Sequence, residues 1–145
     1  MKLLIFLFAN VLNQTSVVAA DADCIEWTKQ ILAGRDDACS DLCPQAQKSD
    51  NYDYASGLKA ALASQSGLTS FLTYTGRSSI IGAGADAQAC TLVAALNKWG
   101  DDVFASEIAR QPAKSGIHIV SLLDYASPER FAERFPKTYA SVAHE

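Results

Sequence analysis

Apolar residues recur at intervals of three and four positions along most of this 145-residue chain, and this period constrains the fold more than any other feature. The pattern is widest over residues 86–100, where Ala89, Leu92, Leu96 and Trp99 share one face of a helix. No long run alternates apolar and polar residues as a half-buried strand does. The sequence therefore predicts an all-α fold, an irregular orthogonal bundle of about six or seven short helices joined by brief loops.

Glycine, proline and acidic residues divide the chain into the expected helices. These cover residues 24–32, 36–42, 54–75 with a break at Gly67, 86–99, 101–108, 112–123 and 128–135. Pro44 is expected to break the second helix or to restart it, Asp86 is expected to cap the 86–99 helix, and the polar stretch 45–51 is predicted to be a loop. The glycine-rich stretch 76–85 lacks the Gly-Lys-Ser/Thr ending of a phosphate-binding loop, and we interpret it as a flexible connection between two helical layers.

Four cysteines, Cys24, Cys39, Cys43 and Cys90, predict a disulfide-stapled fold with two bonds. Cys39 and Cys43 lie four positions apart, and within one helix this spacing disfavours a bond between them. A helical hairpin turning near Gly34 favours Cys24 with Cys43 and Cys39 with Cys90. The pairing of Cys24 with Cys39 and Cys43 with Cys90 stays open. Cys-x3-Cys is not the usual zinc spacing, so no metal site is predicted.

The N-terminal residues have the layout of a secretory signal peptide. Lys2 precedes an apolar run over residues 3–9, and small residues follow at 17–20. Cleavage before Asp21 satisfies the small-residue rule, and a second register lies before Asp23. We therefore expect a cleavable signal over residues 1–20, a single helical domain over 21–145, and a secreted or periplasmic protein.

The charge balance narrows the classes of partner. The chain has 16 acidic and 12 basic residues, a net charge of −4, which becomes −5 when Lys2 leaves with the signal. An acidic chain without a run of Lys or Arg is a poor match for nucleic acid. The apolar run of the signal is too short to span a bilayer, so no membrane insertion is expected after cleavage.

No catalytic residue is assigned from the sequence. His118, Ser121 and Asp124 have the side chains of a hydrolytic triad, but their spacing on one helix does not bring three groups into one line. Glu26 and Glu107 alternate with inward-facing residues, and we expect both to point to water. No pair of carboxylates is selected for glycoside cleavage, and no cofactor is expected.

The segment Asn51-Tyr52-Asp53-Tyr54 is the best candidate for an exposed contact site, through Tyr52 and Tyr54. By elimination, the sequence favours a protein-binding module, such as a periplasmic inhibitor or an immunity-type partner, over an enzyme. Two alternatives stay open: a small secreted hydrolase whose acid and base groups converge in the fold, and a carrier of small apolar ligands. The oligomeric state is not predicted.

Overall fold

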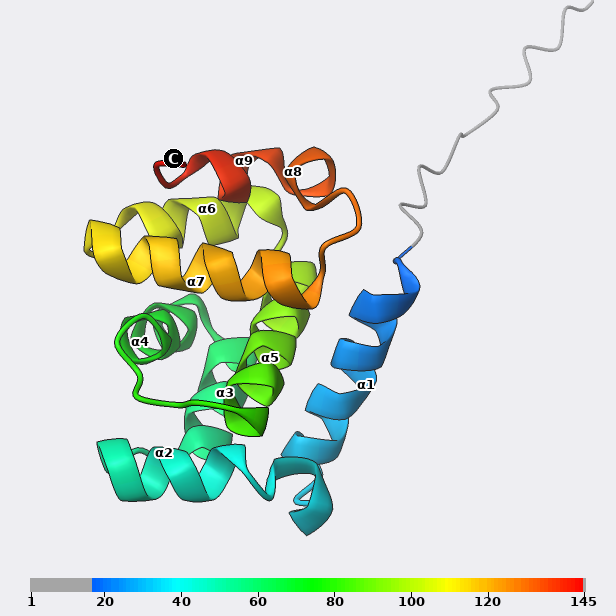
Figure 1. Ribbon diagram of the computed structural model, residues 1–145, viewed down its shortest axis with the longest axis vertical. Coiled ribbons are helices and arrows are strands. Elements are labelled where there is room, and N and C mark those ends of the chain that lie inside the picture. The colour runs from blue at the N-terminus through cyan, green and yellow to red at the C-terminus, as the bar shows by residue number, and fades with distance from the viewer. Residues whose placement is uncertain (1–16, 145) are drawn as a thin grey trace, which may run out of the picture.

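The computed structural model describes residues 17–144, and within them the chain forms nine α-helices, one 3-10 helix and no strand. The all-α prediction is confirmed (Figure 1). The helices outnumber the prediction because α2 occupies most of a stretch predicted to be a loop, and because a further helix follows Phe135. The elements are α1 (Ala19–Leu32), η1 (Asp36–Cys39), α2 (Leu42–Asp50), α3 (Tyr54–Ala63), α4 (Gln65–Thr75), α5 (Ala83–Trp99), α6 (Asp101–Ala109), α7 (Ala113–Ala126), α8 (Phe131–Arg134) and α9 (Pro136–Ala140).

Helix α5 is the central element of the bundle (Figure 1). Helices α1 and α7 make the most extensive contacts with it, and α2, α3 and α6 also pack against it. Ala89, Leu92 and Leu96 are completely buried, as the periodicity predicts, whereas Trp99 is only partly buried. The hydrophobic effect at this helix therefore gathers the others around a common core.

Two helix boundaries differ from the prediction. Pro44 is the third residue of α2, so of the two outcomes expected at Pro44 a new helix starts there, because N–H groups in the first turn have no acceptor within the helix and proline is tolerated. The prediction of a loop over 45–51 is therefore wrong for all but the last residue. Helix α5 begins at Ala83, after Gly82 with φ 61°, and Asp86 lies in its first turn without acting as the cap.

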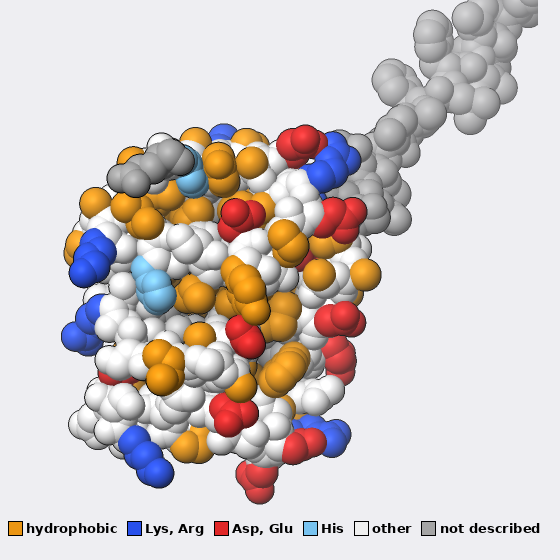
Figure 2. All heavy atoms as spheres, viewed as in Figure 1, with side chains coloured by type: hydrophobic (Ala, Val, Ile, Leu, Met, Phe, Trp, Pro, Cys, Tyr) orange, Lys and Arg blue, Asp and Glu red, His pale blue; other side chains and the backbone are white. Residues whose placement is uncertain are grey.

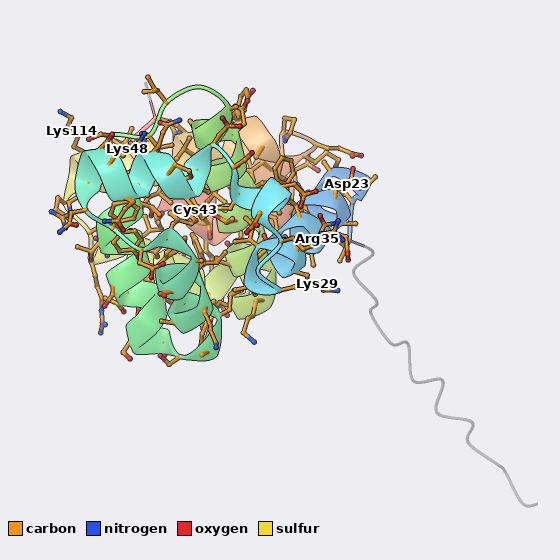
Figure 3. All side chains as sticks on the ribbon, turned by 90° about the horizontal axis from the view of Figure 1, so that it is seen from below. Asp23, Lys29, Arg35, Cys43, Lys48 and Lys114 are labelled. Atoms are coloured by element: carbon orange, nitrogen blue, oxygen red, sulfur yellow. A yellow bond between two sulfur atoms is a disulfide. The ribbon has the colours of Figure 1, made fainter. Side chains whose placement is uncertain are left out.

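Both predicted disulfide pairings are wrong, although all four cysteines are bonded as expected. The bonds join Cys24 to Cys90 and Cys39 to Cys43. Cys39 is the last residue of η1 and Cys43 is the second residue of α2, so no single helix contains both. The chain turns between them and brings their Cα atoms to 5.3 Å, within the range of a disulfide. Figure 3 shows Cys43 on α2.

Helices α3 and α4 meet at a corner that only glycine fits. A Cβ atom on Gly67 would lie 2.0 Å from the backbone oxygen of Ala60. The Trp99 indole N–H donates to the Ala61 carbonyl at 2.8 Å and so ties α5 to α3 beside this corner. The break between the two helices falls at Ser64, three positions before the predicted break at Gly67, and Gly67 lies in the first turn of α4, where the close approach of α3 leaves no room for a side chain.

The C-terminal helices are capped from a distant part of the chain. The Asp101 carboxylate accepts the backbone N–H groups of Lys137 and Thr138, at 2.9 and 2.8 Å. Tyr139 of α9 packs edge-on against the buried Phe131 of α8. These contacts hold the last two helices against α6.

The predicted signal over residues 1–20 lies mostly outside the described residues and stays a prediction. Between residues 17 and 144, every helix is too short or too polar to cross a bilayer. The two disulfides fit an extracellular or periplasmic protein. On the face shown in Figure 2, hydrophobic side chains are interspersed with acids and do not form one large patch.

Candidate functional site

The connection between α2 and α3 holds the predicted contact residues in a defined backbone. Asn51 ends α2 with φ 51°, a left-handed conformation that asparagine tolerates, and the Tyr52 N–H donates to the Ala46 carbonyl at 3.1 Å. The Asp53 carboxylate then caps α3 by accepting the Ser56 N–H at 3.1 Å. These hydrogen bonds therefore fix the backbone at Tyr52 and Tyr54.

Three tyrosine rings pack together at this connection. The rings of Tyr52 and Tyr74 are stacked with centroids 3.6 Å apart, and Tyr54 meets each of them edge-on at 6.2 Å. Tyr54 is 1% exposed, its hydroxyl lies 2.6 Å from the Thr91 hydroxyl, and burial raises its pKa. Tyr52 is only partly buried. Of the two predicted contact residues, Tyr52 alone offers surface to a partner.

Side chains of α2 hold the loop over residues 76–82 in place. The Gln45 amide donates to the Ile81 carbonyl and accepts the Ile81 N–H, both at 3.1 Å. At the other end of α2, the Asp50 carboxylate accepts the Ser79 N–H at 3.1 Å and the Tyr74 hydroxyl at 2.8 Å. The stretch interpreted as a flexible connection is therefore fastened along α2 at two points.

The fastened loop turns one isoleucine inward and the next one outward. Ile80 is 7% exposed and belongs to the core, whereas Ile81 is 73% exposed. A loop whose backbone is fixed by three hydrogen bonds with the side chains of Gln45 and Asp50 thus presents a large apolar group to solvent. The sequence signal for this feature is an apolar pair inside a glycine-rich connection, because neighbouring residues of an extended segment point in opposite directions.

Charge at this site is concentrated on Asp50 and Arg77. Burial raises the pKa of Asp50, but the hydrogen bonds from Ser79 and Tyr74 and the nearby Arg77 outweigh this effect and leave the pKa below its usual value. Burial and the bond to Asp50 raise the pKa of Tyr74. Asp50, Tyr74 and Arg77 line a hollow of about 100 Å³. Near neutral pH, Asp50 is ionised and Tyr74 is a neutral donor.

The residues considered for hydrolysis are not joined in the structure. His118 is partly buried on α7, the Ser121 hydroxyl donates to the Ile117 carbonyl at 2.8 Å, and Asp124 is exposed. No hydrogen bond links His118, Ser121 and Asp124 within the described residues. The imidazole of His144 stacks on the Tyr139 ring at 3.8 Å.

Glu107 does not point to water, and the expectation that it would is wrong. Its carboxylate is fully buried and accepts the Gln65 amide at 3.0 Å and the Thr69 hydroxyl at 2.7 Å. Burial raises the pKa of Glu107. The two hydrogen bonds and Arg110, whose guanidinium lies 3.6 Å from the carboxylate, outweigh this effect and leave the pKa below its usual value. Glu26 is exposed, as expected. Among residues 17–144, no three metal-ligating side chains of His, Cys, Asp or Glu come together.

Basic side chains are dispersed in the view from below. Figure 3 shows Lys48 and Lys114 toward one side of the molecule and Lys29 and Arg35 toward the other.

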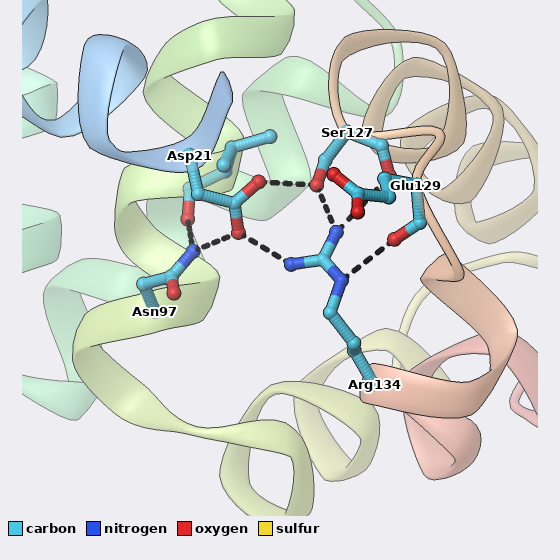
Figure 4. Close-up of polar contacts among 6 residues, drawn as sticks. Asp21, Asn97, Ser127, Glu129 and Arg134 are labelled. Atoms are coloured by element: carbon cyan, nitrogen blue, oxygen red, sulfur yellow. Dashed lines mark hydrogen bonds and ion pairs between the residues drawn. The ribbon is translucent and has the colours of Figure 1, made fainter. Parts of the chain in front are cut away.

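A second polar cluster, missed by sequence reasoning, surrounds Asp21 at the start of α1 (Figure 4). The Asp21 carboxylate is fully buried and accepts the Asn97 amide at 2.9 Å, the Ser127 hydroxyl, and the Arg134 guanidinium at 2.8 Å. Arg134 also donates to the Glu129 carbonyl at 2.8 Å. We call Asp21, Asn97, Ser127 and Arg134 the Asp21 cluster. It joins α1, α5 and the segment around α8.

A hollow of about 690 Å³ lies beside the Asp21 cluster. Its lining combines apolar side chains, among them Val18, Leu96 and Phe135, with the charged side chains of Arg130 and Glu133. The mixed lining does not favour a purely apolar ligand over a polar one, so the apolar-carrier alternative stays a prediction.

No family model, curated protein or solved structure matches this chain.

Proposed function

We propose that this chain is an exported protein-binding module that contacts its partner through Tyr52, Arg77 and Ile81, which we call the Ile81 surface. The observation that carries the proposal is the exposed Ile81 side chain on a loop fastened to α2 by Gln45 and Asp50. Export is supported by the signal-like N-terminus and by the two disulfides.

An exposed isoleucine on a rigid loop suits the energetics of association. Burying such a side chain contributes roughly 1.5–3 kcal/mol. Because the loop is already ordered, a partner does not bear the cost of ordering it on binding. Arg77 lies on the same loop, and Tyr52 stacks on Tyr74, which lines the hollow at Arg77; both are of the residue types that most often dominate binding energies.

The surface also indicates the chemistry of the partner. Ile81 requires an apolar pocket, and Arg77 requires a carboxylate or carbonyl oxygen at the rim of that pocket. The surrounding protein is acidic overall, with a net charge of −4 for the whole chain. A protein with an apolar cleft in a neutral or basic surface, such as an enzyme to be inhibited, has these properties.

The test compares the effect on partner binding of replacing two exposed isoleucines, Ile81 and Ile117, by aspartate. The processed, oxidised protein and its Ile81→Asp and Ile117→Asp variants are incubated with extract of the exported compartment, and bound proteins are identified by mass spectrometry. Ile117 is a matched control because it is also exposed, at 43%, but lies on α7. We expect Ile81→Asp to lower the affinity for a stoichiometric partner roughly 10- to 100-fold, and Ile117→Asp to leave that affinity unchanged.

Two results overturn the proposal. One is that no protein binds the wild-type chain in stoichiometric amount, which favours activity screens around His118 and the hydrolase alternative. The other is a partner whose affinity is the same for the wild type and Ile81→Asp, which places the interface elsewhere. Circular dichroism of both variants establishes that they are folded.

A further inference from the structure

We infer that the signal peptidase cuts between Ala20 and Asp21, and not between Ala22 and Asp23. The sequence offers both registers, and the inference rests on the export that forms part of the proposed function. The geometry of the Asp21 cluster distinguishes the two cuts, because only the first leaves Asp21 in the mature chain.

The folded domain uses the Asp21 carboxylate as the common acceptor of three donors. Asn97 comes from α5, Ser127 follows α7, and Arg134 ends α8, so a single side chain near the start of α1 joins three other parts of the bundle (Figure 4). The carboxylate is fully buried, and the Arg134 side chain is 21% exposed. The free energy of unfolding depends strongly on both members of such a buried ion pair.

A cut before Asp23 would remove this acceptor and leave its donors behind. The Arg134 guanidinium would lose its ion pair, and the 1% exposed Ser127 would lose the carboxylate beside its hydroxyl. Removing one partner of a buried charge pair is costly because the other charge stays in a poorly solvated place. Only one residue would then precede Cys24, whose disulfide holds α1 to α5.

A cut before Asp21 is tolerated by the same surroundings. Ala19 and Ala20 are exposed and small, and, besides the regular bonds within α1, the cut removes the Val18 carbonyl that accepts the Ala22 N–H at 3.0 Å. The first N–H groups of a helix have no intrahelical acceptor, so α1 starts as well at Asp21 as at Ala19. The new α-ammonium group lies next to the carboxylates of Asp21 and Asp23, which offset its unfavourable position at a helix N-terminus.

The experiment expresses the full chain in a bacterium with a general secretion system and measures the intact mass of the exported, reduced protein. A mass beginning at Asp21 supports the inference. A mass beginning at Asp23 overturns it while leaving export intact. An uncleaved chain that stays in the cytoplasm overturns both the cut and the exported part of the proposed function. Binding through Ile81 is measured separately, so its failure is distinguishable from either result.

A matched pair of variants tests the physical reason. Asp21→Asn removes the buried charge, whereas Asp23→Asn changes an exposed carboxylate two positions away. We expect Asp21→Asn to lower Tm by about 5–10 °C and Asp23→Asn to leave it unchanged. Equal Tm values for the two variants overturn the argument that the fold requires Asp21, whichever terminus the mass shows.

Discussion

Replacing each disulfide by two alanines separates the contributions of a long and a short covalent loop. The Cys24–Cys90 bond spans 66 positions and the Cys39–Cys43 bond spans 4. In the chain-entropy model, the long loop contributes about 4 kcal/mol to the free energy of unfolding and the short loop about 2 kcal/mol. We therefore expect C24A/C90A to be destabilised by about twice as much as C39A/C43A.

Urea titration without reductant measures the difference. Each variant and the wild type are unfolded under the same conditions, and the midpoint and the slope are fitted to a two-state transition. We expect the wild type to be the most stable and C24A/C90A the least. A slope that is the same for all three shows that the comparison is made between similar unfolded states.

One result would refute this reasoning directly. If C39A/C43A lost as much stability as C24A/C90A, loop length would not decide what each bond contributes. Peptide mapping of the oxidised protein gives an independent check, because a recovered Cys24–Cys43 or Cys39–Cys90 peptide pair contradicts the connectivity itself.

Three further predictions concern buried groups. Tyr54→Phe lowers the free energy of unfolding by about 1 kcal/mol, because the Thr91 hydroxyl already donates to a backbone carbonyl and Tyr54 must be the donor between them; an unchanged urea midpoint contradicts this. Gly67→Ala costs about 1–3 kcal/mol through its clash with the Ala60 carbonyl, and a wild-type Tm would show that the corner relaxes. Because the pKa of Glu107 is lowered by folding, its stabilisation is present above the unfolded pKa of about 4.3 and is lost as pH falls through the folded value. Unfolding from pH 7 to 3 should therefore depend less on pH in Glu107→Gln, and identical slopes contradict the assignment.

The helical period of apolar residues was sufficient to predict the fold class and most of the core. Burial of one side of a helix is a local property, and Leu92 and Leu96 show it in the sequence itself. The disulfide pairing was not predictable in this way. It depends on whether Cys39 and Cys43 belong to one helix or to two, and the turn between them has no strong local signal.

The polar clusters were not predictable because their members come from distant segments. Glu107 accepts hydrogen bonds from residues 42 and 38 positions away, and its alternation with inward-facing neighbours indicates only an exposed residue. Asp21 and Arg134 are 113 positions apart. The exposure of Ile81 on an ordered loop could be predicted only if α2 was known to extend to Asp50. With a loop predicted over 45–51, Gln45 and Asp50 had no helix from which to bind residues 79–81.

The order in which the cysteines are synthesised gives the short disulfide a further consequence. In an exported chain that enters the oxidising compartment N-terminus first, Cys24, Cys39 and Cys43 arrive before Cys90, so Cys24 has two wrong partners available before its own partner arrives. A loop of four positions closes faster than one of fifteen or nineteen, because loop closure becomes less probable as the chain between the ends lengthens. We expect the Cys39–Cys43 bond to form first and to remove both competitors. The Cys39–Cys43 bond then protects Cys24 from wrong pairing, and the Cys24 thiol of α1 stays free until Cys90 is available to bond with it.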